Sequence, residues 1–328
     1  YMAGGAILSS LLPEIFSFHG GMIMSAVVFI GITLIGGLWS SGLANIVSVP
    51  LIYIGIIYSA IQSVSNVGGW DAVLSKLPNP EVMGSPVAGL AFATILGWII
   101  VMITQTITAQ GPVQIACGAK NAKAARNGYV LAGLMIFPVG FICAVLGVVC
   151  KAMYPEMPVA QAALAMPKVV MTLDPLAGGV TLAALWAADV STACNLLLSA
   201  GTLFSSDIYK RFINPQCDQA RQLLMTRACI IISGILTLGL AMSVSSILGT
   251  IMIGLSLTAA FSVIVIVALF FPQYASKAAG FWTLLAGLVL LVLWQLTPAV
   301  RIFPNVIYME WLVCIVAYAI AAIVCPAK

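Results

Sequence analysis

The chain has 328 residues, of which 62% are apolar and only 7% are charged, and its formal net charge is +4. A soluble domain carries about 25% charged residues, which form the polar shell around its core. The composition therefore excludes a soluble globular protein and predicts an integral membrane protein. Because the long apolar runs lack the apolar–polar alternation of a barrel strand, we expect an all-α, polytopic bundle of transmembrane helices.

The hydropathy pattern predicts one partial and nine complete membrane spans. Residues 1–12 are too short to cross the bilayer and carry no start methionine, so we interpret them as the end of a truncated helix. The complete spans are expected at 20–38, 43–63, 86–110, 127–150, 175–204, 225–246, 248–271, 278–297 and 308–325. The division inside 228–271 depends on the turn signal of Ser243, Ser245, Ser246 and Gly249. We expect 1–328 to be a single transmembrane transporter domain.

The distribution of basic residues predicts the orientation of the chain. With the loop 118–127 in the cytoplasm, nine of the 13 Lys and Arg residues fall on the cytoplasmic side. Acidic residues lean the other way, and Glu310 is assigned to the outside. This asymmetry predicts that the loop 118–127 lies in the cytoplasm. We expect a multi-pass integral protein of the cell (plasma or inner) membrane.

One acidic side chain, Asp189, lies well inside a predicted span. An ionisable residue in hydrocarbon is costly unless it faces a partner or water, so it is a functional candidate. A stripe of small and polar residues runs beside it at i, i+3, i+4 and i+7: Ala188, Ser191, Thr192 and Asn195. Hydroxyls and a backbone carbonyl form a hard-oxygen site that suits a small alkali cation. The alternative is that both hydroxyls bond back to their own helix while the acid faces a polar neighbour.

A second polar stretch lies near the end of the third complete span. It contains Gln105, Thr106 and Gln110, and we expect Gly111-Pro112 to interrupt the helix there. Broken helices at membrane depth line cavities, so these three residues are candidate solute contacts. The alternative is a frayed helix end with hydrated glutamines. Ser256 is a weaker candidate, because small residues four or five apart often indicate close helix packing.

The sequence contains no motif of a soluble catalytic site. It has no P-loop, no GxSxG, no HExxH and no histidine within a predicted span, so we expect no enzyme and no nucleotide hydrolysis by this chain. The eight cysteines include no CxxC, and six of them lie within apolar helices and are interpreted as small buried residues: Cys143, Cys150, Cys194, Cys229, Cys314 and Cys325. A channel is a further alternative, which conductance without saturation by solute would reveal, whereas a membrane-embedded sensor or enzyme subunit has no positive feature in its favour.

Four regions are similar, in the same order, to segments of the sodium/solute symporter family. The most specific is Ser191-Thr192 followed by Ser-Ala-Gly-Thr-Leu-Phe-Ser-Ser-Asp-Ile-Tyr-Lys at 199–210, which resembles the family's signature helix. The others are 36–39, 110–114 together with 119–126, and 246–272.

This resemblance implies a fold of two inverted five-helix repeats from which the first core helices are missing. It also implies that Na⁺, the coupling ion, binds between the first and eighth core helices. The carbonyl of Ala188 and the hydroxyls of Ser191 and Thr192 would supply one half of that site, and the other half would lie outside this sequence.

Several positions depart from the family pattern. Ala44-Asn45 stands where many members carry Thr-Asp in support of an additional cation, Ile115 replaces an arginine, and Leu198 replaces an asparagine. These departures argue against a second sodium site. Asp189 stands where the family has an apolar residue, and our hypothesis is that it modifies the ion site, either by tightening sodium binding or by allowing protons to substitute.

The expected function is sodium:solute symport, in which a small organic solute or anion enters the cell by alternating access. The alternative is a proton-coupled symporter of the same fold that uses Asp189. Gln105 lies about where sugar-carrying members present an aromatic ring, which weakly disfavours stacking on a sugar. We expect the partners to be the solute and the lipid bilayer, with no nucleic acid and no obligate protein partner.

Overall fold

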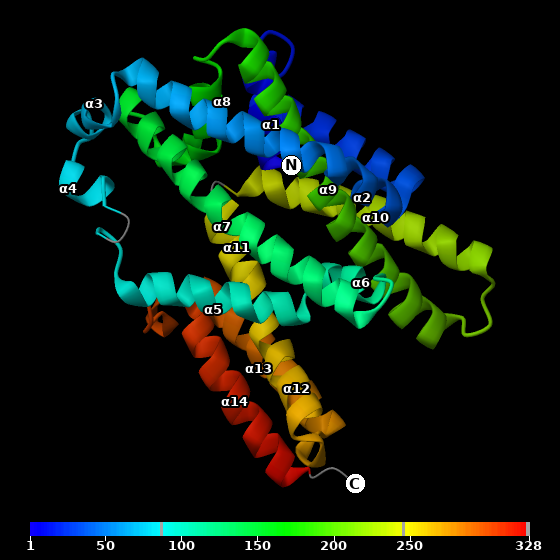
Figure 1. Ribbon diagram of the computed structural model, residues 1–328. Coiled ribbons are helices and arrows are strands. Elements are labelled where there is room, and N and C mark those ends of the chain that lie inside the picture. Colours follow the sequence, from blue (N-terminus) through cyan, green and yellow to red (C-terminus); the bar gives the residue numbers. More distant parts are fainter. Residues whose placement is uncertain (86–87, 245–246, 326–328) are drawn as a thin grey trace. The chain divides into compact units, whose positions relative to one another are not determined.

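The computed structural model describes residues 1–85, 88–244 and 247–325, with no account of the side chains of 37–41, 44, 159, 160 and 253 (Figure 1). The chain divides into two compact units, unit 1 (1–85 and 120–246) and unit 2 (86–119 and 247–328), and each is described by itself. The described elements are helical throughout, as the composition predicts.

Unit 1 contains eight α-helices and two irregular ones within its described residues. The α-helices are α1 (Met2–Leu11), α2 (Phe18–Val67), α3 (Trp70–Ser75), α4 (Pro80–Met83), α7 (Ala122–Met153), α8 (Ala165–Val170), α9 (Pro175–Leu203) and, after the π-helix η2 (Phe204–Ile213), α10 (Gln219–Ser243). A 3-10 helix, η1 (Val159–Leu164), precedes α8.

Unit 2 is built from α5 (Phe92–Thr108), α6 (Gln110–Cys117), α11 (Ile247–Ser256), α12 (Thr258–Phe270), α13 (Lys277–Leu296) and α14 (Val306–Val324). Two short 3-10 helices, η3 (Pro272–Tyr274) and η4 (Pro298–Val300), precede α13 and α14 respectively, with loops between. Across both units the described residues provide eight spans long and apolar enough to cross a membrane, or nine if the bent pair α5 and α6 forms one.

Although α2 is helical over 50 residues, it forms two spans, Phe18–Gly36 and Asn45–Val67. Ser25 contacts Trp186 and Ser59 contacts Thr181, each at 3.4 Å, and these two partners lie only five positions apart on α9. In a straight helix Ser25 and Ser59 would be separated by about 51 Å. These two spans, the two arms of α2, must therefore fold back on each other along α9. This agrees with the sequence, which predicts a break between two spans inside α2.

Helix starts in both units follow ordinary capping chemistry. The Asp174 carboxylate accepts the backbone N–H groups of Leu176 and Ala177, and Pro175 occupies the first position of α9, where no N–H partner is needed. Asn121 and Asp218 cap α7 and α10 in the same way. Capping side chains in the preceding loops therefore mark where α7, α9 and α10 begin.

The break between α5 and α6 lies at Ala109, two residues before the expected Gly111-Pro112, and bends the pair by 45°. Ala109 has an extended backbone, so α6 begins at Gln110 and Pro112 falls in its first turn. A proline is tolerated there because the first N–H groups of a helix have no partner, whereas within a continuous helix it would clash with the carbonyl of Thr108. The helix therefore ends before the proline.

The division between the spans at 225–246 and 248–271 is confirmed, since α10 ends at Ser243 and α11 begins at Ile247. Ser245 and Ser246, on which that prediction partly depended, lie outside the described residues. A further interruption at Leu257 separates α11 from α12, and the sequence analysis did not predict it.

Gly55 lets the second arm of α2 approach α9 closely. A methyl group there would lie 2.7 Å from Thr181 Oγ1 and 3.1 Å from its Cα, so Gly55→Ala is expected to destabilise the protein by about 1–3 kcal/mol through overpacking. Gly31→Ala on the first arm meets nothing within 4 Å and is expected to raise stability by up to about 1 kcal/mol through helix propensity. Thermal unfolding of the two detergent-purified variants checks this contrast, and equal melting temperatures would contradict it.

Candidate functional site

The predicted ion-site residues lie in the middle of α9, which packs along both arms of α2. Trp186 lies 6.1 Å from the ring of Phe29, and Cys194 Sγ lies 3.7 Å from the carbonyl oxygen of Phe29. Contacts before and after the candidate residues therefore hold this segment against one arm. Asp189, Ser191 and Asn195 are half-buried, whereas Thr192 is exposed.

The carbonyl of Ala188 and the hydroxyl of Ser191 are brought together by the helix itself. Ser191 Oγ donates to Ala188 O at 2.9 Å, which is the helix-internal bond given as the alternative for this residue. The two oxygens point to the same side of the helix and lie close enough to share a small cation, in which case the ion would replace the shared proton between them.

Thr192 behaves differently from other threonines of this protein. Thr181, Thr226 and Thr283 each donate to the carbonyl four residues earlier, at 2.8–3.0 Å. The corresponding acceptor for Thr192 is Ala188 O, which accepts from Ser191 instead. Within the described part of the chain the Thr192 hydroxyl makes no hydrogen bond, so its oxygen is available to a ligand.

Two further oxygens on α9 are buried without a hydrogen-bond partner among the described residues, Asp189 Oδ2 and Asn195 Oδ1. Buried polar atoms are normally satisfied, so an unpaired pair on one helix is a mark of a binding region. Asn195 lies seven positions after Ala188 and therefore shares its face, while Asp189 lies about 100° around the helix.

The predicted solute-contact residues are in unit 2 and differ among themselves. Gln105 and Gln110 flank the break at Ala109 and are half-buried. Thr106 is exposed, and its hydroxyl donates to Met102 O at 2.7 Å. Ser256 is fully buried and donates to Met252 O at 2.7 Å, an arrangement typical of helix packing.

Glu310 was counted by the sequence analysis among the acidic residues on the outer side of the membrane, and the burial of its side chain was not predicted. Its side chain is 0% exposed, and Oε1 has no hydrogen-bond partner among the described residues. The predicted span began at residue 308, which left this acid at an apparent membrane boundary. The signal that could have revealed it is Asn305, which caps α14 and places Glu310 in its second turn.

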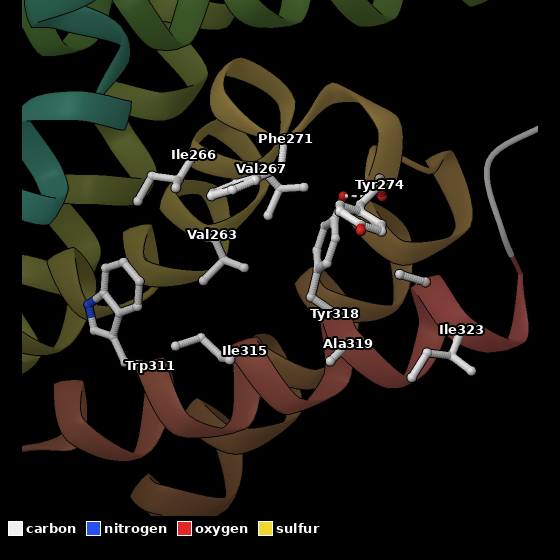
Figure 2. Close-up of a pocket in the computed structure, with 11 residues that line it drawn as sticks. Val263, Ile266, Val267, Phe271, Tyr274, Trp311, Ile315, Tyr318, Ala319 and Ile323 are labelled. Carbon is white, nitrogen blue, oxygen red and sulfur yellow. Dashed lines mark hydrogen bonds between the residues drawn. The ribbon is translucent and has the colours of Figure 1, made fainter.

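An apolar groove of about 470 Å³ lies between α12 and α14, and no predicted site residue is among its lining residues (Figure 2). Val263 and Val267 face Ile315 and Tyr318 across it. Its lining offers no charged side chain, so it suits hydrocarbon and not an ion or a polar solute. Among the described residues no group of three or more His, Cys, Asp or Glu side chains gathers to hold a metal ion.

Comparison with protein-family models matches residues 1–287 to the sodium:solute symporter family. A solved structure of a Na⁺-coupled sialic acid symporter, described as substrate-bound and outward-open, superposes on this fold with a TM-score of 0.74. It is 18% identical in sequence, and the match covers 100% of this chain and 73% of that one. The two chains therefore share a fold.

Two curated relatives carry the name of sodium/glucose cotransporters. The one from Vibrio parahaemolyticus is 24% identical over 269 residues, covering 70% of this chain and 47% of its own length. Sodium/glucose cotransporter 4 from Mus musculus is 28% identical over 243 residues, covering 66% of this chain and 35% of its own length. The matched region thus spans about half or less of these relatives.

Proposed function

Because the chain belongs to the sodium:solute symporter family, we propose that the protein is a sodium-coupled symporter that carries a small organic solute or anion into the cell by alternating access. We further propose that 1–328 acts as one transmembrane transporter domain to which both compact units contribute. The inward sodium gradient would drive uptake, with about 2.3 kcal/mol per charge for each 100 mV of membrane potential in addition to the concentration term.

The sodium site is proposed at Ala188, Ser191 and Thr192. The observation that supports it most directly is the 2.9 Å approach of Ser191 Oγ to Ala188 O, together with the unbonded hydroxyl of Thr192 one position further on. Three neutral oxygens on one stripe of a membrane helix offer the hard ligands that replace water around Na⁺ without requiring a charged cage.

The solute is proposed to contact the broken span of unit 2. Gln105 and Gln110 lie on either side of the Ala109 break, and interrupted helices are the usual place for solute binding in inverted-repeat transporters. Thr106 and Ser256 use their hydroxyl protons within their own helices, so any solute would meet their oxygens as acceptors. The relatives' names point to sugars and a sialic acid, both polyhydroxylated, and amide side chains suit such ligands.

A proton-coupled symporter is the second candidate, and the observation in its favour is Asp189. Its Oδ2 atom is buried without a hydrogen-bond partner among the described residues. A carboxyl in this position could hold a proton in place of, or beside, a sodium ion.

The sodium proposal predicts selective loss of ion coupling when one ligand is removed. In liposomes containing the full-length protein, Ser191→Ala or Thr192→Val should raise the half-saturating sodium concentration about 10- to 100-fold, as expected for a lost charge-assisted contact of about 1.5–3 kcal/mol. The measurement is uptake of a labelled solute panel with and without an inward sodium gradient.

Ser233→Ala is the matched control, because Ser233 makes the same helix-internal bond, to Ile230 O at 3.2 Å, on α10. It should leave the sodium dependence unchanged. If the site variants behaved like this control, α9 would not hold the ion.

Asp189→Asn tests the choice between the two coupling ions. We expect it to change the dependence of uptake on sodium and pH more than the ranking of solutes, since the change removes a titratable group beside the proposed ion site. Uptake at two pH values, each with and without sodium, measures this. Sodium and pH dependence identical to wild type would exclude a role for Asp189 in coupling.

A further inference from the structure

Glu310 on α14 is the only acidic residue in the sequence of unit 2, and its side chain is completely buried. The proposed symport mechanism does not use it. Burying an acidic side chain inside a membrane protein costs free energy, so such a residue is a candidate for a functional role.

The carboxyl group of Glu310 packs against the middle of α13. A methyl group built on Gly287 would lie 3.1 Å from Glu310 Oε2, 3.1 Å from Ala260 Cβ and 3.3 Å from Cys314 Sγ. Gly287 is the eleventh of the 20 residues of α13, so the carboxyl lies level with the centre of that span. Only a glycine leaves room for the acid there.

No positive charge reaches this carboxyl within the described residues. Cys314 Sγ lies 3.6 Å from Oε2 as its one hydrogen-bond partner, and Oε1 has none. Of the basic residues of unit 2, Arg301 donates to the carbonyls of Trp294 and Gln295. Lys277 begins α13, ten residues or about 15 Å along the helix from Gly287.

The groups that face the carboxyl also make a poor cation site. From α14 it meets the titratable Cys314 thiol, and the methyl of Ala260 on α12 borders the same space beside Gly287. From α13 it meets Gly287, and the nearby Thr283 already donates its hydroxyl proton to Ala279 O at 2.8 Å. Hard cations require several oxygen ligands, which this cluster does not supply.

An ionised carboxylate would be buried here without a counter-charge, whereas a neutral carboxylic acid requires no counter-charge and costs far less to bury. We propose that Glu310 is a proton-binding site of unit 2: the bound proton keeps the carboxyl neutral while α13 and α14 are packed together, and it leaves only when these helices separate enough to admit water. Proton binding at Glu310 thereby stabilises the packing of α12, α13 and α14.

This proposal is independent of the sodium and solute sites, because none of the residues beside the Glu310 carboxyl is a proposed ligand and its test requires no transport. Any effect on transport would act through α12, which continues the span that contains Ser256. Failure of the symport proposal would leave it intact, and the reverse also holds.

The stability of the purified protein tests the proposal. Above the pH at which an exposed glutamate ionises, the unfolded chain has lost this proton and the native state keeps it, so stability falls as pH rises. Glu310 alone should raise the unfolding equilibrium constant tenfold per pH unit. Glu310→Gln, which resembles the neutral acid in size and polarity, should fold and should remove that tenfold step.

Glu156→Gln is the matched control, because Glu156 is an exposed acid in unit 1. It should retain the wild-type pH slope. A Glu310→Gln variant with the wild-type slope would overturn the proposal, since the native carboxyl would then carry its charge in the folded state as well.

Infrared spectroscopy of wild-type protein in lipid gives an independent test that requires no stability measurement. The carbonyl stretch of protonated Glu310 should appear at neutral pH as a band that Glu310→Gln removes and that Glu156→Gln and Asp189→Asn both leave in place. If the band were instead absent from wild type, or if added Na⁺ abolished it, the site would hold no proton or would hold a cation.

Discussion

The close approach of α9 to both arms of α2 is the contact on which the arrangement of unit 1 depends. Within lipid there is little hydrophobic gain from pairing two apolar helices, so small residues that permit close packing and interhelical hydrogen bonds must supply the preference. Gly55, Ser25 and Ser59 provide such positions on α2, and Thr181 and Trp186 meet them on α9. These contacts convert a 50-residue helical stretch into a hairpin.

This packing also presents the candidate ion site. Because α9 is held on both sides of Asp189, the backbone that carries Ala188, Ser191 and Thr192 has a fixed position, and Ser191 is held further by its bond to Ala188 O. Preorganised oxygens select for an ion better than mobile ones, since little ordering remains to be done on binding. The exposure of Thr192 and the unpaired amide oxygen of Asn195 leave this surface open to further ligands.

The buried hydroxyls of unit 2 donate either within their own helix, as Ser256 and Thr283 do, or to a neighbouring helix, as Ser262 does. Thr104 on α5 joins three helices, because its carbonyl accepts from Ser262 at 3.2 Å and its hydroxyl accepts from Trp311 at 3.3 Å. α5 is thereby tied to α12 and α14 although its own helix is interrupted a turn later. Glu310 is the exception, because its carboxyl has oxygen atoms in excess of the donors around it.

The sequence alone determined that the chain lies in a membrane, that it is helical and where most spans lie. The reason is that lipid requires about 20 apolar residues per crossing, and caps such as Asp174 mark where helices begin. It also determined the stripe Ala188, Ser191 and Thr192, since helical periodicity is a local property. Only the tertiary structure decided that Ser191 bonds to Ala188 while Thr192 does not, and that Glu310 is buried at the centre of a neighbouring span. Burial and hydrogen-bond partners come from residues distant in sequence, such as Gly287 for Glu310, and no local pattern carries that information.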